Sequence, residues 1–180
     1  MANHKLYEKT ISSEIVFSGN FLEVKKDKVE QHDGKTFSRE YLEHPGASLI
    51  VPQMPNGELL FIRQFRYALK EVFIEFPAGK RDAAEDYETA AHRELLEETG
   101  YKAGALDFMC TLHPVIGYSN ERIDCFLAKD LVLETAHCDE GENIELFPLS
   151  LTTALDFHKK GKITDAKTII ALLWYEKWSN

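Results

Sequence analysis

The chain has 180 residues, 44% of them hydrophobic, which is typical of one folded domain with at most a small appendage. No apolar run approaches the roughly 20 residues of a membrane-spanning helix, and the polar start of the chain lacks the apolar stretch of a secretory signal. The formal net charge of −9 argues against nucleic acid or an anionic membrane as a partner, since both require a basic face.

The cysteine content indicates the redox environment. The three cysteines, Cys110, Cys125 and Cys138, are odd in number and lack the spacing of metal ligands. Disulfide frameworks are typical of secreted proteins, whereas cytosolic thiols stay reduced. We therefore expect reduced thiols in a cytoplasmic protein.

The N-terminal part of the chain is predicted to form a β-rich arm. Its two strand candidates are residues 21–31 and 36–44. The Asp33-Gly34 pair between them is a strong signal for a hairpin turn, and the Pro45-Gly46 pair then breaks the pattern. The sequence therefore predicts an N-terminal arm, residues 1–46, followed by a main domain, residues 47–180.

The main domain alternates between strand and helix patterns. Its strand candidates are residues 47–53, 58–66, 72–76, 106–113, 122–129 and 144–147. Its helix candidates are residues 87–99, 151–160 and 165–178, with Asp86, Gly100, Gly161 and Thr164 as caps or stops. Residues 77–79, Pro-Ala-Gly, are expected to form a loop. Strands on both sides of a central helix, followed by two terminal helices, predict an α/β fold with helices packed on a mixed sheet.

The helix predicted at residues 87–99 carries a distinctive set of carboxylates. Glu94, Glu97 and Glu98 lie at i, i+3 and i+4, so all three project from one face. The residues expected on the opposite, core-facing side are Leu95 and Leu96. Like charges at this spacing repel unless they share a cation, and hard cations such as Mg²⁺ prefer carboxylate oxygens. Arg93 can hold Glu97 in place by an ion pair, although a glutamate-rich helix face taken alone is most often solvated surface.

A longer motif surrounds this helix. Gly79, five residues, Glu85, seven residues and then Arg-Glu-Leu-Leu-Glu-Glu-Thr-Gly-Tyr at residues 93–101 match a 23-residue motif at every specified position. From average residue usage, a chance match in a chain of this length is on the order of one in ten million. The chain therefore resembles the Nudix family, in which this motif is the Nudix box.

The resemblance to the Nudix family implies both a fold and a metal site. The fold would be an α/β/α sandwich with a mixed sheet, here extended by an N-terminal antiparallel β-arm. By position, Glu94 and Glu98 would be metal ligands, Glu97 a ligand or the general base, and the backbone carbonyl of Ala78 a further ligand. The residues that would orient these groups are Arg93 and Glu85. The site would hold two or three divalent ions, Mg²⁺ or Mn²⁺.

The segments before the box narrow the resemblance to ADP-ribose and nucleotide-sugar pyrophosphatases. Similar enzymes carry runs like those found here at residues 63–66 and 73–79. By that likeness Arg66 would reach the diphosphate of the substrate, which suits the fixed fork of donors on a guanidinium. Glu75 in the second run remains open between a partner of the site residues and an ordinary strand residue.

A loop after the box resembles the one that receives the terminal sugar in these enzymes. It spans residues 117–121, and the likeness implies Gly117 and Glu121 as substrate-binding residues. Ile116 stands where the subfamily usually has a proline. This departure weakens strict ADP-ribose specificity and favours a broader range of nucleotide sugars.

The acidic segment at residues 139–145 allows two interpretations. From composition alone, an acidic loop is most often solvated surface. The resemblance instead implies a loop with a Glu-x-Glu pattern, in which Glu142 is a further metal ligand and Glu140 the general base. If the loop is only solvated, Glu97 takes the role of base.

These features predict an enzyme that uses metal ions to hydrolyse the pyrophosphate of ADP-ribose or a related nucleoside diphosphate sugar. The products would be a nucleoside monophosphate and a sugar phosphate. The nearest alternative is a Nudix enzyme for another pyrophosphate, such as a dinucleoside polyphosphate, coenzyme A or a nucleoside triphosphate. A non-catalytic domain that senses ADP-ribose is disfavoured, because such domains typically lose box glutamates and this chain keeps them all.

The arm at residues 1–46 is expected to take part in self-association. A two-stranded hairpin is marginal in water, and this one carries more apolar side chains than a free arm should expose. These side chains are Phe17, Phe21, Leu22, Val24, Phe37, Tyr41 and Leu42. Enzymes of the subfamily commonly exchange this region across a two-fold axis. We therefore predict a homodimer whose arm helps to build the substrate pocket.

Overall fold

The structure, a computed structural model, describes residues 5–134 and 143–178. By its internal contacts the chain divides into two compact units. The arm unit comprises residues 1–45 together with 115–122, and the main unit comprises residues 46–114 together with 123–180. The loop at 115–122 therefore groups with the N-terminal segment, although it lies far from that segment in the sequence.

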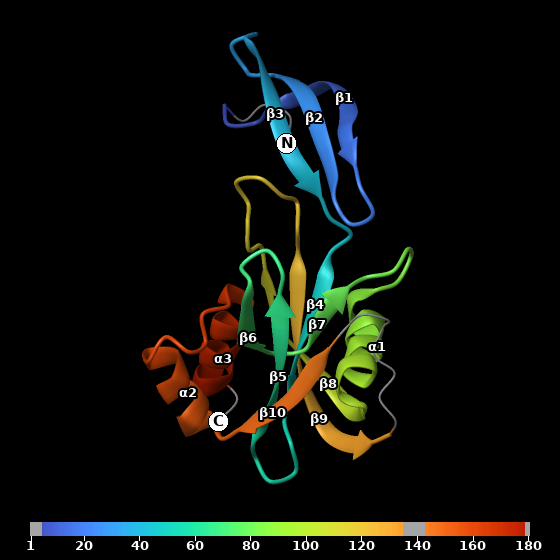
Figure 1. Ribbon diagram of the computed structural model, residues 1–180. Helices are drawn as coiled ribbons and strands as arrows, with labels where there is room; N and C mark the ends of the chain where they lie inside the picture. Colours follow the sequence, from blue (N-terminus) through green and yellow to red (C-terminus); the bar gives the residue numbers. More distant parts are fainter. Residues whose placement is uncertain (1–4, 135–142, 179–180) are drawn as a thin grey trace. The chain divides into compact units, whose positions relative to one another are not determined.

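The arm unit is an antiparallel sheet of three strands, β1 (Lys9–Ser18), β2 (Glu23–Glu30) and β3 (Thr36–Glu43), with β2 in the middle (Figure 1). The turn between β2 and β3 confirms the predicted hairpin: Gly34 has a φ of 81° and its N–H donates to the Gln31 carbonyl at 2.9 Å. The expectation of two strands in the arm is wrong, because β1 adds a third. All ten residues of β1 are exposed, so no alternation of buried and exposed positions marks it in the sequence.

The main unit holds two sheets. Their strands are β4 (Ala47–Pro52), β5 (Leu59–Arg66), β6 (Glu71–Glu75), β7 (Ala78–Lys80), β8 (Tyr101–Leu112), β9 (Ile123–Leu133) and β10 (Ile144–Leu149). The first sheet has the order β7-β4-β9-β8 and is mixed, since β4 and β9 run parallel while the other pairs are antiparallel. The second has the order β10-β5-β6 and is antiparallel.

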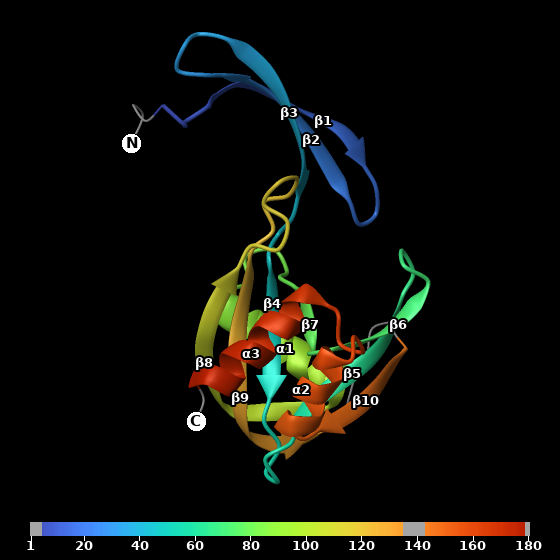
Figure 2. The ribbon, with the colours of Figure 1, turned by 90° about the vertical axis from the view of Figure 1, so that its left-hand side faces the viewer.

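Within the described residues, three helices cover these sheets: α1 (Tyr87–Thr99), α2 (Leu151–Lys159) and α3 (Ala166–Trp178). Helix α1 lies on one side of the strands, and α2 and α3 lie together on the other (Figures 1 and 2). This layering confirms the predicted α/β/α sandwich with a mixed sheet and an antiparallel N-terminal sheet. The bounds of α1 are those predicted from the sequence.

Three local predictions for the main unit are wrong. Residues 78–80 form strand β7 and not a loop, because their backbone pairs with β4. The Ala-Gly sequence itself carries no strand signal. Strand β8 begins at Tyr101, directly after α1, and is several residues longer than expected. Helix α3 is capped by Asp165 and not by Thr164, since the Asp165 carboxylate accepts from the Thr168 N–H at 3.0 Å.

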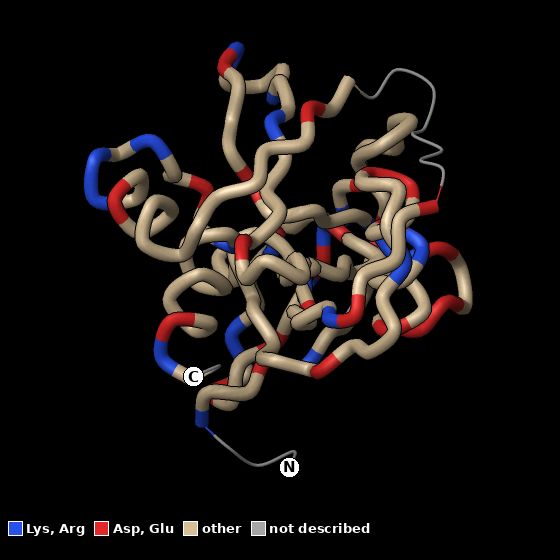
Figure 3. Tube along the Cα trace, turned by 90° about the horizontal axis from the view of Figure 1, so that it is seen from below, with Lys and Arg blue, Asp and Glu red and all other residues tan. Residues whose placement is uncertain are grey.

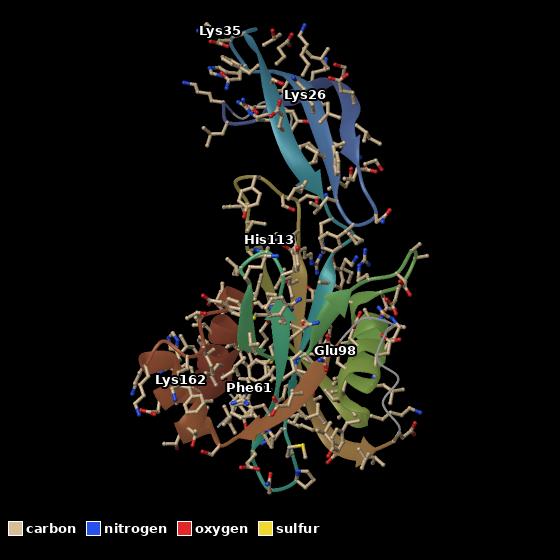
Figure 4. All side chains as sticks on the ribbon, viewed as in Figure 1. Lys26, Lys35, Phe61, Glu98, His113 and Lys162 are labelled. Atoms are coloured by element: carbon tan, nitrogen blue, oxygen red, sulfur yellow. The ribbon has the colours of Figure 1, made fainter. Side chains whose placement is uncertain are left out.

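The core of the main unit is built around β4 and β5. All six residues of β4 are buried, as expected for a strand that is paired on both edges and covered by helices. Phe61 of β5 and Phe76 are both fully buried, and their rings stack with centroids 4.2 Å apart (Figure 4 labels Phe61). Strand β6 ends beside this stack at Glu75, so the core fixes the position at which the chain enters residues 77–79.

Charges of both signs are interspersed over the chain. Figure 3 shows Lys and Arg scattered among Asp and Glu. In the arm unit, Lys25 and Lys26 of β2 form ion pairs with Glu43 and Glu40 of β3. Among the described helices, none is long and apolar enough to cross a membrane.

Candidate active site

Helix α1 is delimited at both ends by the residues that the sequence predicted. The Asp86 side chain accepts from the Thr89 N–H at 2.7 Å, which caps the N-terminus. At the other end Gly100 adopts a φ of 75° and its N–H donates to the Leu96 carbonyl at 2.8 Å. The two caps fix which residues of α1 face the sheets.

The carboxylates of α1 are more buried than a solvated helix face would be. Glu94 and Glu98 are 9% and 5% exposed, and Figure 4 shows Glu98 on the side of α1 that faces the strands. Glu97 is only partly covered. Leu95, which follows Glu94 and was expected on the core-facing side, is fully buried. The buried arc of α1 therefore contains two carboxylates beside core residues, which ordinary surface glutamates do not explain.

Arg93 gathers the acidic residues of this region. Its guanidinium donates to Glu85 at 3.0 and 3.1 Å, to Glu94 at 2.7 Å and to Glu97 at 2.8 Å. It also donates to the Lys80 carbonyl at 2.8 Å. These hydrogen bonds, first of all that of Glu85, raise the pKa of Arg93, and the same contact lowers the pKa of Glu85. The ion pair predicted between Arg93 and Glu97 is present, as one part of a larger network.

The loop at the start of the motif packs directly against the glutamates. A Cβ atom on Gly79 would overlap the Glu94 carboxylate, so any other residue here would force that carboxylate to move. The neighbouring Ala78 N–H donates to Glu98 Oε2 at 3.0 Å. The strand β7 thus places the Ala78 backbone beside Glu98.

The donor set of this site suits a hard divalent cation. Glu94 and Glu98 lie one helical turn apart in a buried position, and every side-chain donor is a carboxylate oxygen, which Mg²⁺ and Mn²⁺ prefer over nitrogen or sulfur. Within residues 5–134 and 143–178, no three His, Cys, Asp or Glu side chains converge into a metal-binding group. The described glutamates therefore have the chemistry of ligands for such a cation, and by themselves they do not complete a site.

Arg66, at the end of β5, holds a buried carboxylate. Its Nε donates to Glu75 Oε1 at 2.7 Å and its NH2 group donates to Glu75 Oε2 at 2.8 Å. Glu75 is 2% exposed, whereas 41% of the Arg66 side chain remains exposed. The hydrogen bond that Arg66 donates to Glu75 is the main cause of a raised Arg66 pKa, and the charge of Glu98 adds to it. Arg66 is therefore close enough for the charge of Glu98 to act on it.

Lys167 was not singled out from the sequence, and the role of Glu75 was left open. The Lys167 ammonium of α3 donates to Glu75 Oε2 and also to Asp165 Oδ2, the latter at 2.9 Å. Glu75 itself, left open by the sequence, is the centre of this network. The available signal was a charged residue within the apolar run Val-Phe-Ile-Glu-Phe, because a buried carboxylate requires cationic partners.

Comparisons with known proteins place the chain in a family. Its sequence matches the NUDIX domain over residues 42–172. The chain belongs to the Nudix family. Residues 8–42 match a second family, described as the nucleoside diphosphate sugar hydrolase N-terminal domain. The Nudix resemblance inferred from the box is thereby confirmed, together with the prediction of a Nudix enzyme.

Several proteins are similar to this Nudix chain over nearly its whole length. It is 35% identical to the ADP-ribose pyrophosphatase of Bacillus subtilis, over 95% of this chain and 94% of that protein. It is also 35% identical to the methanol dehydrogenase activator of Bacillus methanolicus, over 96% and 95% of the two chains. A crystal structure of an ADP compounds hydrolase superposes with a TM-score of 0.83 at 25% identity, covering 95% of this chain and 93% of that one.

The structure assembles only some of the residues that the sequence singled out. Within the main unit Ala78 contacts Glu98, Arg93 links Glu94 with Glu97, and the charge of Glu98 acts on Arg66. The other two substrate-binding candidates, Gly117 and Glu121, belong to the arm unit. The remaining two, Glu140 and Glu142, lie outside the described residues.

The loop with Gly117 and Glu121 is fastened to the arm sheet. The Leu42 N–H donates to the Tyr118 carbonyl at 2.8 Å, and the His44 N–H donates to the Asn120 side chain at 2.8 Å. Glu121 lies 4.0 Å from the His44 imidazole. The arm and this loop therefore form one unit of the Nudix chain.

Proposed function

We propose that this Nudix enzyme hydrolyses the pyrophosphate of ADP-ribose or of a related nucleoside diphosphate sugar. The observation that carries the proposal is the pairing of two buried glutamates, Glu94 and Glu98, with a guanidinium within electrostatic reach, Arg66. Anionic ligands for metal and a cationic contact for phosphate are the two requirements for binding a diphosphate. The names of the relatives and the match of residues 8–42 support a nucleotide sugar as the substrate.

The box residues are proposed to hold the metal. Glu94, Glu98 and the Ala78 carbonyl would be ligands to Mg²⁺ or Mn²⁺, joined by Glu142. A bound divalent ion would supply charge neutralisation at the diphosphate and polarise the phosphorus under attack. Arg93 keeps Glu94 oriented through a 2.7 Å hydrogen bond, so the ligand carboxylate need not reorganise when substrate binds.

The proton of the attacking water is proposed to go to a carboxylate. Glu140 is the first candidate and Glu97 the second. Glu97 Oε2 accepts from Arg93 at 2.8 Å, so this carboxylate is already engaged by a guanidinium, and we therefore place Glu140 first. Arg66 would stabilise the negative charge that develops on the phosphate oxygens.

The arm unit is proposed to mediate a homodimer and to contribute to the substrate pocket, with Gly117 and Glu121 at the sugar. The support is the exposure of apolar side chains on the arm sheet: Phe17 is 55% exposed, Phe21 65% and Phe37 41%. A patch of this kind normally marks an interaction surface. We also propose a cytoplasmic location, in which Cys110 and Cys125 stay reduced.

The proposal is tested with a panel of ADP-ribose, ADP-glucose, GDP-mannose and NADH in the presence of Mg²⁺, scored by product identity. A nucleoside monophosphate and a sugar phosphate are the expected products. Turnover only of dinucleoside polyphosphates, coenzyme A or nucleoside triphosphates, added as further substrates, would move the enzyme to the alternative class. Binding of ADP-ribose without any turnover would instead indicate a sensing domain.

A further inference from the structure

Arg66 and Glu75 form an ion pair although the strand pairing of β5 and β6 does not place them opposite each other. In the β5–β6 ladder Arg66 lies opposite Glu71, and Glu75 lies opposite Ile62. Antiparallel strands rise about 3.4 Å per residue, so Glu75 is four residues, roughly 14 Å, along β6 from Glu71, the cross-strand neighbour of Arg66. The Arg66 side chain therefore extends along the sheet to Glu75, although an acidic residue stands directly across from it.

The bidentate contact leaves part of the guanidinium available. A guanidinium has five N–H donors in a planar fork, and the Glu75 carboxylate engages the Nε edge and one N–H of NH2. The opposite edge, with the N–H groups of NH1, faces away from Glu75. A planar group fixed along one edge presents the other edge in a defined direction, whereas a free arginine would lose several rotamers on binding.

Helix α3 fixes the carboxylate from its other side. Lys167 donates to Glu75 Oε2 and is itself held by Asp165 at 2.9 Å. The next residue, Thr168, accepts from the Phe76 N–H at 3.0 Å through its fully buried hydroxyl. The first turn of α3 thus contacts both the side chain of Glu75 and the backbone of the residue after it. Glu75 is held in one position before any substrate arrives.

The buried carboxylate of Glu75 is compensated by two cations, Arg66 and Lys167. Burial alone would raise the pKa of Glu75, yet the hydrogen bonds from Arg66 and the charge of Lys167 outweigh it and lower that pKa overall. Glu75 is therefore an anion that serves two cations. Without Lys167, the single carboxylate would face Arg66 alone and would neutralise more of the guanidinium charge that a phosphate needs.

We propose that Glu75, held by Lys167, is a positioning residue that aims the free edge of the Arg66 guanidinium at the substrate diphosphate. This inference rests on the proposed function, in which Arg66 contacts that diphosphate. Glu75 makes no contact with the reacting atoms. Its effect on catalysis passes entirely through Arg66, and this separates it from a residue that merely stabilises the fold.

A double-mutant cycle on the full-length protein tests the inference. Glu75→Gln keeps the shape of the side chain and removes its charge, and ADP-ribose with Mg²⁺ is the probe. In the wild-type background this substitution should raise KM by about tenfold with a smaller change in kcat, because a mis-aimed arginine weakens diphosphate binding. In an Arg66→Ala background the same substitution should change KM by less than about twofold.

Two further variants serve as a control and as a second test. Glu71→Gln makes the same chemical change at the exposed residue directly across from Arg66 and should leave KM unaltered. Lys167→Met should raise KM in the same direction as Glu75→Gln but less, and its effect should also vanish in the Arg66→Ala background. Lys167→Met carries the test if Glu75→Gln fails to fold.

The outcomes separate the two proposals. A wild-type enzyme without turnover of any nucleotide sugar overturns the proposed function and this inference with it. Normal wild-type turnover, combined with KM effects of Glu75→Gln and Arg66→Ala that multiply independently, overturns the inference alone. A loss of thermal stability in Glu75→Gln without any change in KM also contradicts it, since that result describes a structural residue.

Discussion

Strands β4 and β1 show how differently the two units of this chain are built. Every residue of β4 is buried, while every residue of β1 is exposed. The first belongs to a sheet that helices cover, and the second carries Ile15, Val16 and Phe17 in the open. The main unit encloses its own core, whereas the arm unit keeps apolar surface that only another surface can cover.

From this contrast we propose different tasks for the two units. The main unit contains the buried glutamates, Arg93 and Arg66, which are the groups that chemistry on a diphosphate requires. The arm unit contains the exposed apolar residues that association requires. Substitutions at the glutamates of the main unit should therefore remove catalysis and leave assembly intact, whereas substitutions on the exposed apolar face of the arm should weaken assembly first.

The largest effect is expected from Glu98→Gln. The change keeps the shape of a buried residue and removes a proposed metal-ligand charge, so kcat should fall by roughly 100- to 1,000-fold while the protein stays folded and associated. Glu88→Gln, an exposed site on the same helix, is the matched control. Near-normal turnover in folded Glu98→Gln, measured across a Mg²⁺ titration, would remove the metal assignment.

A charge on the arm should disrupt assembly. Phe17→Glu places a carboxylate on the exposed apolar side of β1, and burial of that charge at an interface should weaken the dimer by about 100-fold. Sedimentation equilibrium measures the dissociation constant, with Ser13→Glu on the same strand as the control. If the wild-type protein sediments as a monomer with full activity, the proposed role of the arm is lost.

Stability should depend on the two units unequally. Phe61→Leu removes a fully buried ring that stacks on Phe76, and should reduce the free energy of unfolding by about 2 kcal/mol. Phe37→Leu in the arm changes a half-exposed ring and should cost less than about 0.5 kcal/mol in the monomer. Urea denaturation of both variants gives the comparison, and equal losses would contradict it.

The acidic segment should separate metal binding from proton transfer. Glu142→Gln should raise the Mg²⁺ concentration for half-maximal rate by about tenfold, while Glu140→Gln should mainly lower kcat. Glu145→Gln, at the exposed last residue of this segment, is the control. Unchanged kinetics in both variants would return this segment to solvated surface and leave Glu97 as the base.

The smallest effect concerns acid stability of the box. The pKa of Glu85 lies below its usual value because of the hydrogen bonds from Arg93, so the pair stabilises the fold above that usual value. The contribution is lost as the pH falls through the lowered pKa. From pH 5 to pH 2.5 the wild type should lose more unfolding free energy than Glu85→Gln, by less than about 1 kcal/mol. Parallel stability curves for the two proteins would show that this pair contributes nothing.

The main unit could be predicted from sequence to a large extent, and particular residues explain why. Helix α1 has a capping aspartate, a terminal glycine and the box itself, so three independent signals define the same bounds. The buried strands β4 and β5 have continuous apolar runs. In each case the information is local, because the residues that cause the structure are its own neighbours in the chain.

Other features depend on contacts that no local pattern encodes. Strand β1 exposes all its residues and is a strand only because β2 pairs with it. The roles of Glu75 and Lys167 emerge when α3 meets the end of β6, across 92 positions in the sequence. The loop at 115–122 joins the arm unit through backbone hydrogen bonds to Leu42. Patterns of side chains in the sequence do not predict such bonds.

Phosphorus NMR of the reaction tests the central claim most directly. Wild-type protein with ADP-ribose and Mg²⁺ should convert the two diphosphate resonances into two phosphomonoester resonances, AMP and ribose 5-phosphate. Phe17→Glu at high protein concentration should retain some conversion, and Glu98→Gln should show almost none. Intact diphosphate in the wild-type reaction, or equal conversion by wild type and Glu98→Gln, would contradict the assignment of diphosphate hydrolysis to the carboxylates of α1.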